Sequence, residues 1–371
     1  MKGRDPIDVL VPLLSDPPDL SALDDEQLWE AVTKNAGPYG VAPLVAFAVR
    51  PHVSGQRRQW CDEVLARSWG RHERMLRQLR WLTDLFEAKN VPTIALKGPA
   101  LAERYYKPAF LRKPSGDLDL AVREEDLRKA CAPLLREGYT FEVPLEEAVK
   151  RSYHVELLHA SRPKVELHFR LSHKALGVPV DEFFERAVSL QLSDGREIQV
   201  LAPADQLLHL VLHLAQSRFG TLFHLCEIRL VSHLEPPAVR AEAIRQAADR
   251  GFRGAVRMVD IAFRSHWGDE FIPPQTLLPP TWLSWRLNEK LLRAFERWSE
   301  PGRSRTLATL LHGRWLDLQV TDSAGDAVRS LLLLASAARF QSARSQWASG
   351  RKISYGPDLS STPARKNDTI P

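Results

Sequence analysis

Residues 95–122, ALKGPALAERYYKPAFLRKPSGDLDLAV, carry the pattern that decides the fold. A short β-prone run ends at Lys97-Gly98, and Pro99 suits the first position of a helix over the segment ALAERYY. Residues 117–122, DLDLAV, alternate carboxylate and aliphatic side chains, which predicts a strand with one polar and one apolar face. The order strand, glycine turn, helix, strand predicts a mixed β/α unit.

Further strands and helices are predicted on both sides of this stretch. Residues 153–171 alternate as two strands joined by a turn at ASRPK, and LQLSDGREIQVLAP contains a hairpin with an Asp-Gly turn. Apolar residues recur at helical spacing from Ser21 to about Asn90, which predicts two or three helices, and again from Pro203 to about Gly350. The first twenty residues are predicted to be extended.

The predicted fold class is therefore α+β, with a mixed sheet flanked by helical regions. We expect four parts, namely an N-terminal helical segment over 1–90, the α/β unit over 91–200, a C-terminal helical domain over 201–353 and a flexible tail over 354–371. The hydrophobic content of 44% and the charged content of 26% are those of an ordinary globular protein.

Net charge, cysteine content and the length of the apolar runs indicate the expected partners and the cellular compartment. A formal charge of +5 leans slightly towards anionic partners such as nucleotides or nucleic acid. The three cysteines are far apart, without a CxxC pair, which favours a reducing cytoplasm. The longest apolar run, residues 331–338, is too short to span a bilayer, so no membrane partner is expected. Oligomeric state is left open.

Two carboxylates spaced one apart on a strand point to metal chemistry. Asp117 and Asp119 would share one face and repel each other unless cations lie between them. Mg²⁺ suits such a site because it takes a few carboxylate oxygens together with substrate phosphates. A metal pair commonly needs a third acid, for which Glu166 on another strand is the best candidate. His168 shares a strand face with Glu166.

The glycine turn supplies a place for phosphates. Backbone N–H groups after Lys97-Gly98 would face an anion, and Gly98 would let a phosphate approach the main chain. Lys97 and Arg112 add positive charge.

These residues resemble the DNA polymerase beta-like nucleotidyltransferase superfamily, and specifically its bacterial uncharacterised nucleotidyltransferase branch. The resemblance spans roughly 90–235. It rests on the LKG turn, the pattern Y...R..SGDLDLAV, Gly138-Tyr139, the strand VELHFRL and the helix LLHLVLH over 207–213.

The resemblance implies transfer of a nucleoside monophosphate from an NTP to an acceptor hydroxyl, with two Mg²⁺ ions. Asp117 and Asp119 would bind both ions and Glu166 would be the third acid. Lys97, Gly98, Arg112 and Ser115 would lie at the nucleotide, with Arg112 either facing the phosphates or orienting the acidic strand. His168 would orient Glu166 or contact the acceptor, unless it is a surface histidine. The acceptor, whether a small molecule, peptide, protein or tRNA, is undetermined.

Two positions depart from the superfamily pattern, which keeps other functions open. Pro99 replaces the serine of a Gly-Ser turn, and the third acid is Glu166 where Asp is more usual. A catalytically inactive nucleotide-binding or partner-binding module is one alternative. An RNA-binding protein is another, because residues 286–352 contain twelve Lys and Arg against six Asp and Glu.

Two further pairs of side chains have competing interpretations. His209 and His213 have zinc-like spacing but no evident third ligand, so packed or substrate-facing histidines are favoured. Tyr105 and Tyr106 are expected in the core rather than against a base.

Overall fold

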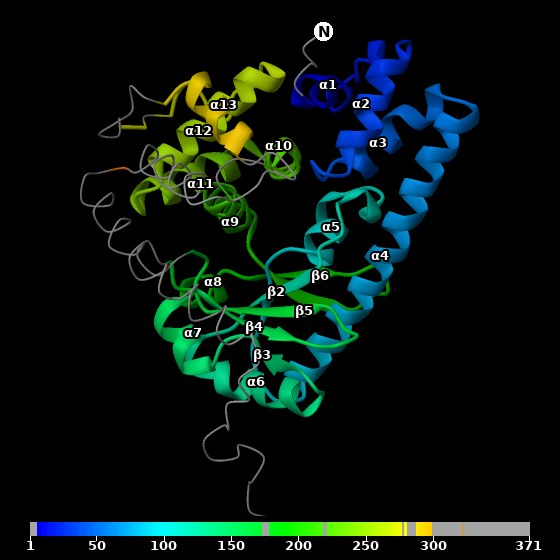
Figure 1. Cartoon of the computed structure of the whole chain (residues 1–371). Helices are drawn as coiled ribbons and strands as arrows, with labels where there is room; N and C mark the ends of the chain where they lie inside the picture. Colours follow the sequence, from blue (N-terminus) through cyan, green and yellow to red (C-terminus); the bar gives the residue numbers. More distant parts are fainter. Residues whose placement is uncertain are drawn as a thin grey trace, which may run out of the picture.

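The computed structural model of the chain describes residues 6–172, 178–217, 221–276, 278–279, 287–298 and 322. The predicted α+β class is confirmed, with helices, then a seven-stranded mixed sheet, then further helices (Figure 1). The region over 286–352 is described only at 287–298 and 322, and the predicted tail over 354–371 lies outside the described residues.

The N-terminal region contains one helix more than the spacing predicted. The helices are α1 (Pro6–Leu13), α2 (Glu26–Ala36), α3 (Ala42–Val49) and α4 (Gly55–Glu87). The prediction of extended chain was wrong for α1. Pro6 occupies its first position and Asp8 its first turn, where both residue types are favourable, and Pro12 comes only at the end.

The sheet has the strand order β3-β4-β5-β2-β1-β7-β6. Its central pair, β2 and β5, is parallel, and the hairpins β4·β5 and β6·β7 are antiparallel as predicted. The strands are β1 (Ile94–Ala95), β2 (Asp117–Ala121), β3 (Thr140–Phe141), β4 (His154–Leu158), β5 (Lys164–His168), β6 (Val188–Gln191) and β7 (Glu197–Val200).

Helices connect the strands and follow the sheet. The connecting helices are α5 (Pro99–Tyr105), α6 (Leu127–Arg136), α7 (Leu145–Arg151) and α8 (Asp181–Phe184). The following helices are α9 (Pro203–Gln216), α10 (Leu222–Leu234), α11 (Pro237–Asp249), α12 (Arg253–Trp267) and α13 (Glu289–Trp298). None of the helices within the described ranges has both the length and the apolar character needed to cross a membrane.

The long helix α4 joins two hydrophobic cores. Its 33 residues extend over about 50 Å, from the N-terminal helices to the sheet (Figure 1). Cys61 and Val64 belong to the core of the N-terminal helices. Further along, Leu79, Leu82 and Phe86 pack into the core beneath the sheet. The predicted domain boundaries stay predictions.

Candidate active site

The central strands β2, β5 and β4 have two chemically different faces. Their apolar face, made by Leu118 and Leu120 of β2 and their neighbours on β5 and β4, packs against α4 and α6. The opposite face is polar, because residues two apart on a strand point the same way. Its members are Asp117, Asp119, Lys164, Glu166, His168, His154 and Glu156.

The strand register brings the three predicted acids together on this polar face. Asp119 lies directly opposite Glu166 in the parallel pair β2·β5. Asp117 is two residues earlier on the same side of β2. The Nζ of Lys164 contacts both Glu166 and Asp117. It forms an ion pair with Glu166 Oε1 and lies 3.9 Å from Asp117 Oδ2. The three carboxylates therefore share one face, although among the described residues they do not form a group whose ligand atoms all lie within 4.8 Å of one another.

Asp119 is the most deeply buried of the three acids. Its Oδ1 accepts hydrogen bonds from Lys97 Nζ at 3.0 Å and from His168 Nε2 at 3.1 Å. Burial alone would raise the pKa of Asp119, but Lys97 and His168 outweigh it and hold this pKa well below its usual range. Asp119 is therefore a carboxylate at neutral pH.

Asp117 and Glu166 have opposite pKa shifts. Burial, helped by the negative charges of Asp119 and Glu166, raises the pKa of Asp117. Burial would also raise the pKa of Glu166, but the hydrogen bond from His168 helps to lower it to about 2. Asp117 is the acid with the greatest need for an added cation.

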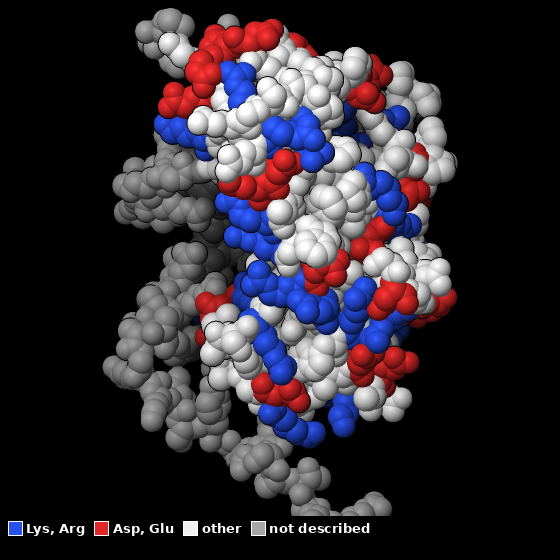
Figure 2. Space-filling model, turned by 90° about the vertical axis from the view of Figure 1, so that its right-hand side faces the viewer, with Lys and Arg blue, Asp and Glu red and all other residues white. Residues whose placement is uncertain are grey.

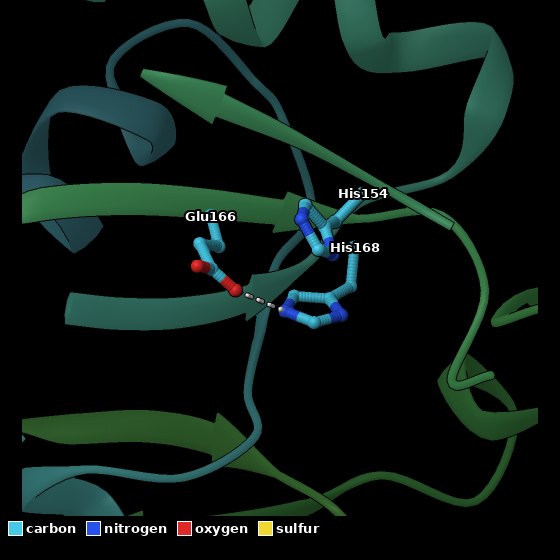
Figure 3. Close-up of side chains that lie close together, drawn as sticks. All are labelled: His154, Glu166 and His168. Carbon is cyan, nitrogen blue, oxygen red and sulfur yellow. Dashed lines mark ion pairs between the residues drawn. The ribbon is translucent and has the colours of Figure 1, made fainter. Parts of the chain in front are cut away.

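A histidine on the neighbouring strand completes this face. His154 of β4 is the register partner of His168, and its Nε2 lies 3.1 Å from Glu156 Oε1. One donor atom from each of His154, Glu166 and His168 lies within 4.8 Å of the others. Figure 3 shows the Glu166 carboxylate directed at the His168 imidazole, at 3.4 Å, with His154 beside them. Within the described residues, the buried Nδ1 atoms of both histidines have no hydrogen-bond partner.

Sequence reasoning overlooked His154, Lys164 and Glu156. The signal was present in the predicted hairpin, because counting back from its turn places His154 and Glu156 opposite His168 and Glu166. Lys164 is two residues before Glu166, and the strand period alone puts it on the polar face.

The glycine turn lies at the edge of this face. Gly98 has φ +66°, a backbone conformation that other residues rarely adopt. A Cβ at this position would lie 4.0 Å from Ser115 Oγ, so Ser115 and Gly98 are neighbours. Gln206 of α9 donates to the carbonyl oxygen of Leu96 at 3.1 Å and fixes the chain just before Lys97.

Comparison with known proteins shows the family of the chain. The model of the family described as "Uncharacterised nucleotidyltransferase" matches residues 25–263, more than half of the sequence. The chain belongs to this nucleotidyltransferase family. Among solved structures, that of the antibiotic-resistance factor ANT(2'')-Ia is similar over 46% of this chain and 90% of its own, with 12% identity and a TM-score of 0.35. No curated protein matches the chain.

Arg112 lies in a buried ion pair. Its Nε donates to Glu227 Oε1 of α10 at 2.5 Å, and its Nη1 donates to Ser115 Oγ at 3.3 Å. Both charged side chains of the pair are at most 5% exposed. A role at the nucleotide stays a prediction for Arg112. The observed contacts hold the loop that leads into β2, which fits the alternative that Arg112 orients the acidic strand.

Of the histidines and tyrosines singled out on helices near the sheet, His209, Tyr105 and Tyr106 are buried and His213 is half-buried. Burial lowers the pKa of His209 and of His213 well below the usual range, so both are neutral. Neither joins the three-residue ligand cluster found in the described part of the chain. Tyr105 and Tyr106 lie in the hydrophobic core, as expected, and the Tyr105 hydroxyl donates to Glu235 at 2.7 Å.

Proposed function

We propose that this protein transfers a nucleoside monophosphate from an NTP to an acceptor hydroxyl and depends on Mg²⁺. The observation that carries the proposal is the convergence of Asp117, Asp119 and Glu166 on one face of two parallel strands. The acceptor hydroxyl loses its proton to solvent and its oxygen forms a bond to the α-phosphorus, while the bond from the α-phosphorus to the bridging oxygen breaks and pyrophosphate leaves with that electron pair.

We propose two divalent cations at these acids, and the charge distribution on the polar face supports this. The three acids are held near one another by positive groups, namely Lys97, Lys164 and His168, so positive charge already occupies the space between them. Asp117 has only the 3.9 Å contact to Lys164 and is the least compensated of the acids. Asp117, Asp119 and Glu166 would hold the ions. When bound, Mg²⁺ lowers the pKa of an acceptor hydroxyl and neutralises charge on the leaving pyrophosphate.

The residues around the acids have complementary roles in this proposal. Gly98 and Ser115 border the space in which the phosphates would lie, and Lys97 supplies a cation there. His168 donates to Asp119 and also approaches Glu166, so it fixes the orientation of both carboxylates. Arg112 positions the loop before β2 through Glu227. We place the reaction in the cytoplasm, which the three unpaired cysteines support.

The proposal is tested by nucleotide incorporation. Purified protein is incubated with Mg²⁺, each α-labelled NTP in turn and a cell extract, and labelled products are identified by mass. The isosteric variant Asp119→Asn should lower incorporation about a hundredfold or more, because one charge on the metal-binding face is lost. Asp249→Asn, an exposed acid on α11, is the matched control and should retain activity.

Two binding measurements separate the alternative functions. NTP binding without any product, in the wild type, would favour the catalytically inactive module and contradict the transferase. RNA affinity that falls steeply with salt and survives Asp117→Ala would favour the RNA-binding protein.

A further inference from the structure

A cavity of about 300 Å³ lies between the N-terminal helices and the loop that leads into β2. Side chains of α2, α3 and α4 line it, together with Lys113 and Pro114 of the loop. Lys113 precedes the first aspartate by four residues, which an extended chain spans in about 14 Å. The cavity is therefore within the reach of a small molecule whose other end lies at the acids.

The charged lining of this cavity has one sign. Arg67, Arg71 and Lys113 line it and are exposed, and none of its lining residues in the described part of the chain carries a carboxylate. Other arginines of α4 have acidic partners, such as Arg57 with Glu26 and Arg80 with Asp194.

The two cavity arginines differ from these in lacking such a partner. Arg67 donates through Nε only to a neutral acceptor, the carbonyl oxygen of Glu63, at 3.1 Å. No ion pair with a carboxylate is recorded for Arg67 or Arg71 in the parts of the chain that the structure covers. Arg67 and Arg71 are one helical turn apart, a spacing at which like charges repel. An anion between them would relieve this repulsion.

Lys113 is an exposed residue whose aliphatic chain passes close to Gly40. Gly40 has φ +77°, and a Cβ there would lie 2.8 Å from Lys113 Cδ and 3.0 Å from Phe223 Cβ. Only glycine leaves room for the lysine side chain to pass. The ammonium group ends 5.8 Å from the centroid of the Phe223 ring.

The cavity and the acidic strand are fixed to each other. Ser68, which also lines the cavity, donates to the carbonyl oxygen of Phe110 at 2.6 Å, just before the loop. The loop is held at its other side by Arg112 and Glu227.

Figure 2 views the molecule from the α4 side, and Lys and Arg gather across the middle of this face among scattered acids.

We infer that this cavity binds the anionic group, a phosphate or carboxylate, of a small acceptor molecule. Guanidinium groups bind both anions through paired N–H donors, and Trp60 offers an aromatic wall for the rest of the molecule. The volume is at the small end for ligand sites, which excludes a bulky acceptor from the cavity itself. The acceptor part of this inference rests on the proposed transferase function.

Arginine-specific labelling tests the site without any need for activity. Native protein is treated with phenylglyoxal, with and without inorganic phosphate, and labelled peptides are quantified by mass spectrometry. Phosphate should slow labelling of Arg67 and Arg71 at least severalfold and leave Arg77 unaffected. Arg77 is an arginine of the same helix that is exposed like Arg67 and Arg71 but lies outside the lining. Equal protection of all three, or of none, overturns the inference.

Two further measurements distinguish this inference from the proposed function. Asp119→Asn should keep the phosphate protection even though it loses transfer activity. Protection that persists when the wild type shows no nucleotide incorporation would refute the transferase and leave the anion site standing. Where incorporation occurs, Arg71→Met should raise the KM for the acceptor about tenfold with little change in the KM for NTP, whereas Arg77→Met should change neither. A selective rise in the KM for NTP overturns the acceptor assignment.

Discussion

At the scale of single residues, the acids of the polar face are compensated by fixed cations. Lys97 bonds Asp119, while Lys164 bonds Glu166 and, at 3.1 Å, Glu156. Isolated buried carboxylates would be costly, so these ammonium groups stabilise the face when no metal is bound. The proposed metal ions and the two lysines would therefore act on the same charges.

Replacing Lys164 tests this compensation. Lys164→Met leaves Glu156 and Glu166 without their shared cation, so the melting temperature in EDTA should fall by roughly 3–6 °C. Added Mg²⁺ should raise the melting temperature of the variant more than that of the wild type. Lys129→Met, which removes an exposed lysine on α6, serves as control. An unchanged melting temperature in EDTA would refute the role of Lys164.

His154 should influence which metal is preferred. Imidazole nitrogen suits Zn²⁺ better than Mg²⁺, and His154 lies close to Glu166 and His168. We expect His154→Ala to weaken Zn²⁺ binding about tenfold, measured by competition with a zinc-binding dye, with little change for Mg²⁺. His52→Ala, at an exposed position, should bind both ions as the wild type does. Equal loss of both ions would show a general disruption of the face.

At the scale of elements, local pattern predicted most strands but not their neighbours. The alternation in residues 117–121 and 164–168 predicted both strands and their polar faces, because the period of two is a local property. The parallel pairing of β2 with β5 joins segments more than forty residues apart, which no local pattern encodes. The partner of Arg112 was hidden for the same reason, since Glu227 is 115 residues away. The missed helix α1 shows that a segment predicted to be extended can form a short helix although it contains Asp8 and Pro12, because Asp8 lies in the first turn and Pro12 at the end.

The ion pair between Arg112 and Glu227 should be essential for joining α10 to the loop before β2. Glu227→Gln leaves the Arg112 guanidinium buried without a counter-charge and should lower the free energy of unfolding by about 3–5 kcal/mol. Urea denaturation measures this change. The double variant Arg112→Met/Glu227→Met removes both charges and should be less destabilised than Glu227→Gln. A single variant as stable as the wild type would contradict the assignment.

At the scale of the whole molecule, α4 connects cores that would otherwise be separate. It contributes Cys61 to the N-terminal core and several apolar side chains to the core beneath the sheet, where Cys131 lies. Continuous helix between two cores couples their unfolding, because one cannot lose its packing without loosening the helix that the other uses.

The two buried thiols report on this coupling. Burial raises the pKa of Cys61 to about 11 and of Cys131 to about 12. Two variants are compared, one that retains Cys61 and one that retains Cys131. In each, the retained thiol should resist a thiol reagent at pH 8, and both thiols should become reactive at the same urea concentration. Reaction of Cys61 at clearly lower urea would show independent unfolding.

The same thiols predict a loss of stability at alkaline pH. An unfolded thiol titrates near pH 8.5, so the folded state retains the proton to higher pH. The stabilisation is complete below about pH 8.5 and is lost as the pH rises towards 11 to 12.

The continuity of α4 also constrains how this sequence can vary. The cavity arginines and the apolar side chains that pack against the sheet follow one another along the single helix α4. Arg71 and Met75 are one helical turn apart. Inserting one residue between them would rotate the arginines by about 100° around the helix axis relative to the sheet. Insertions should be tolerated in the surface turns between elements. An insertion between Arg71 and Met75 would instead move the guanidinium groups out of the cavity that they line together with Lys113.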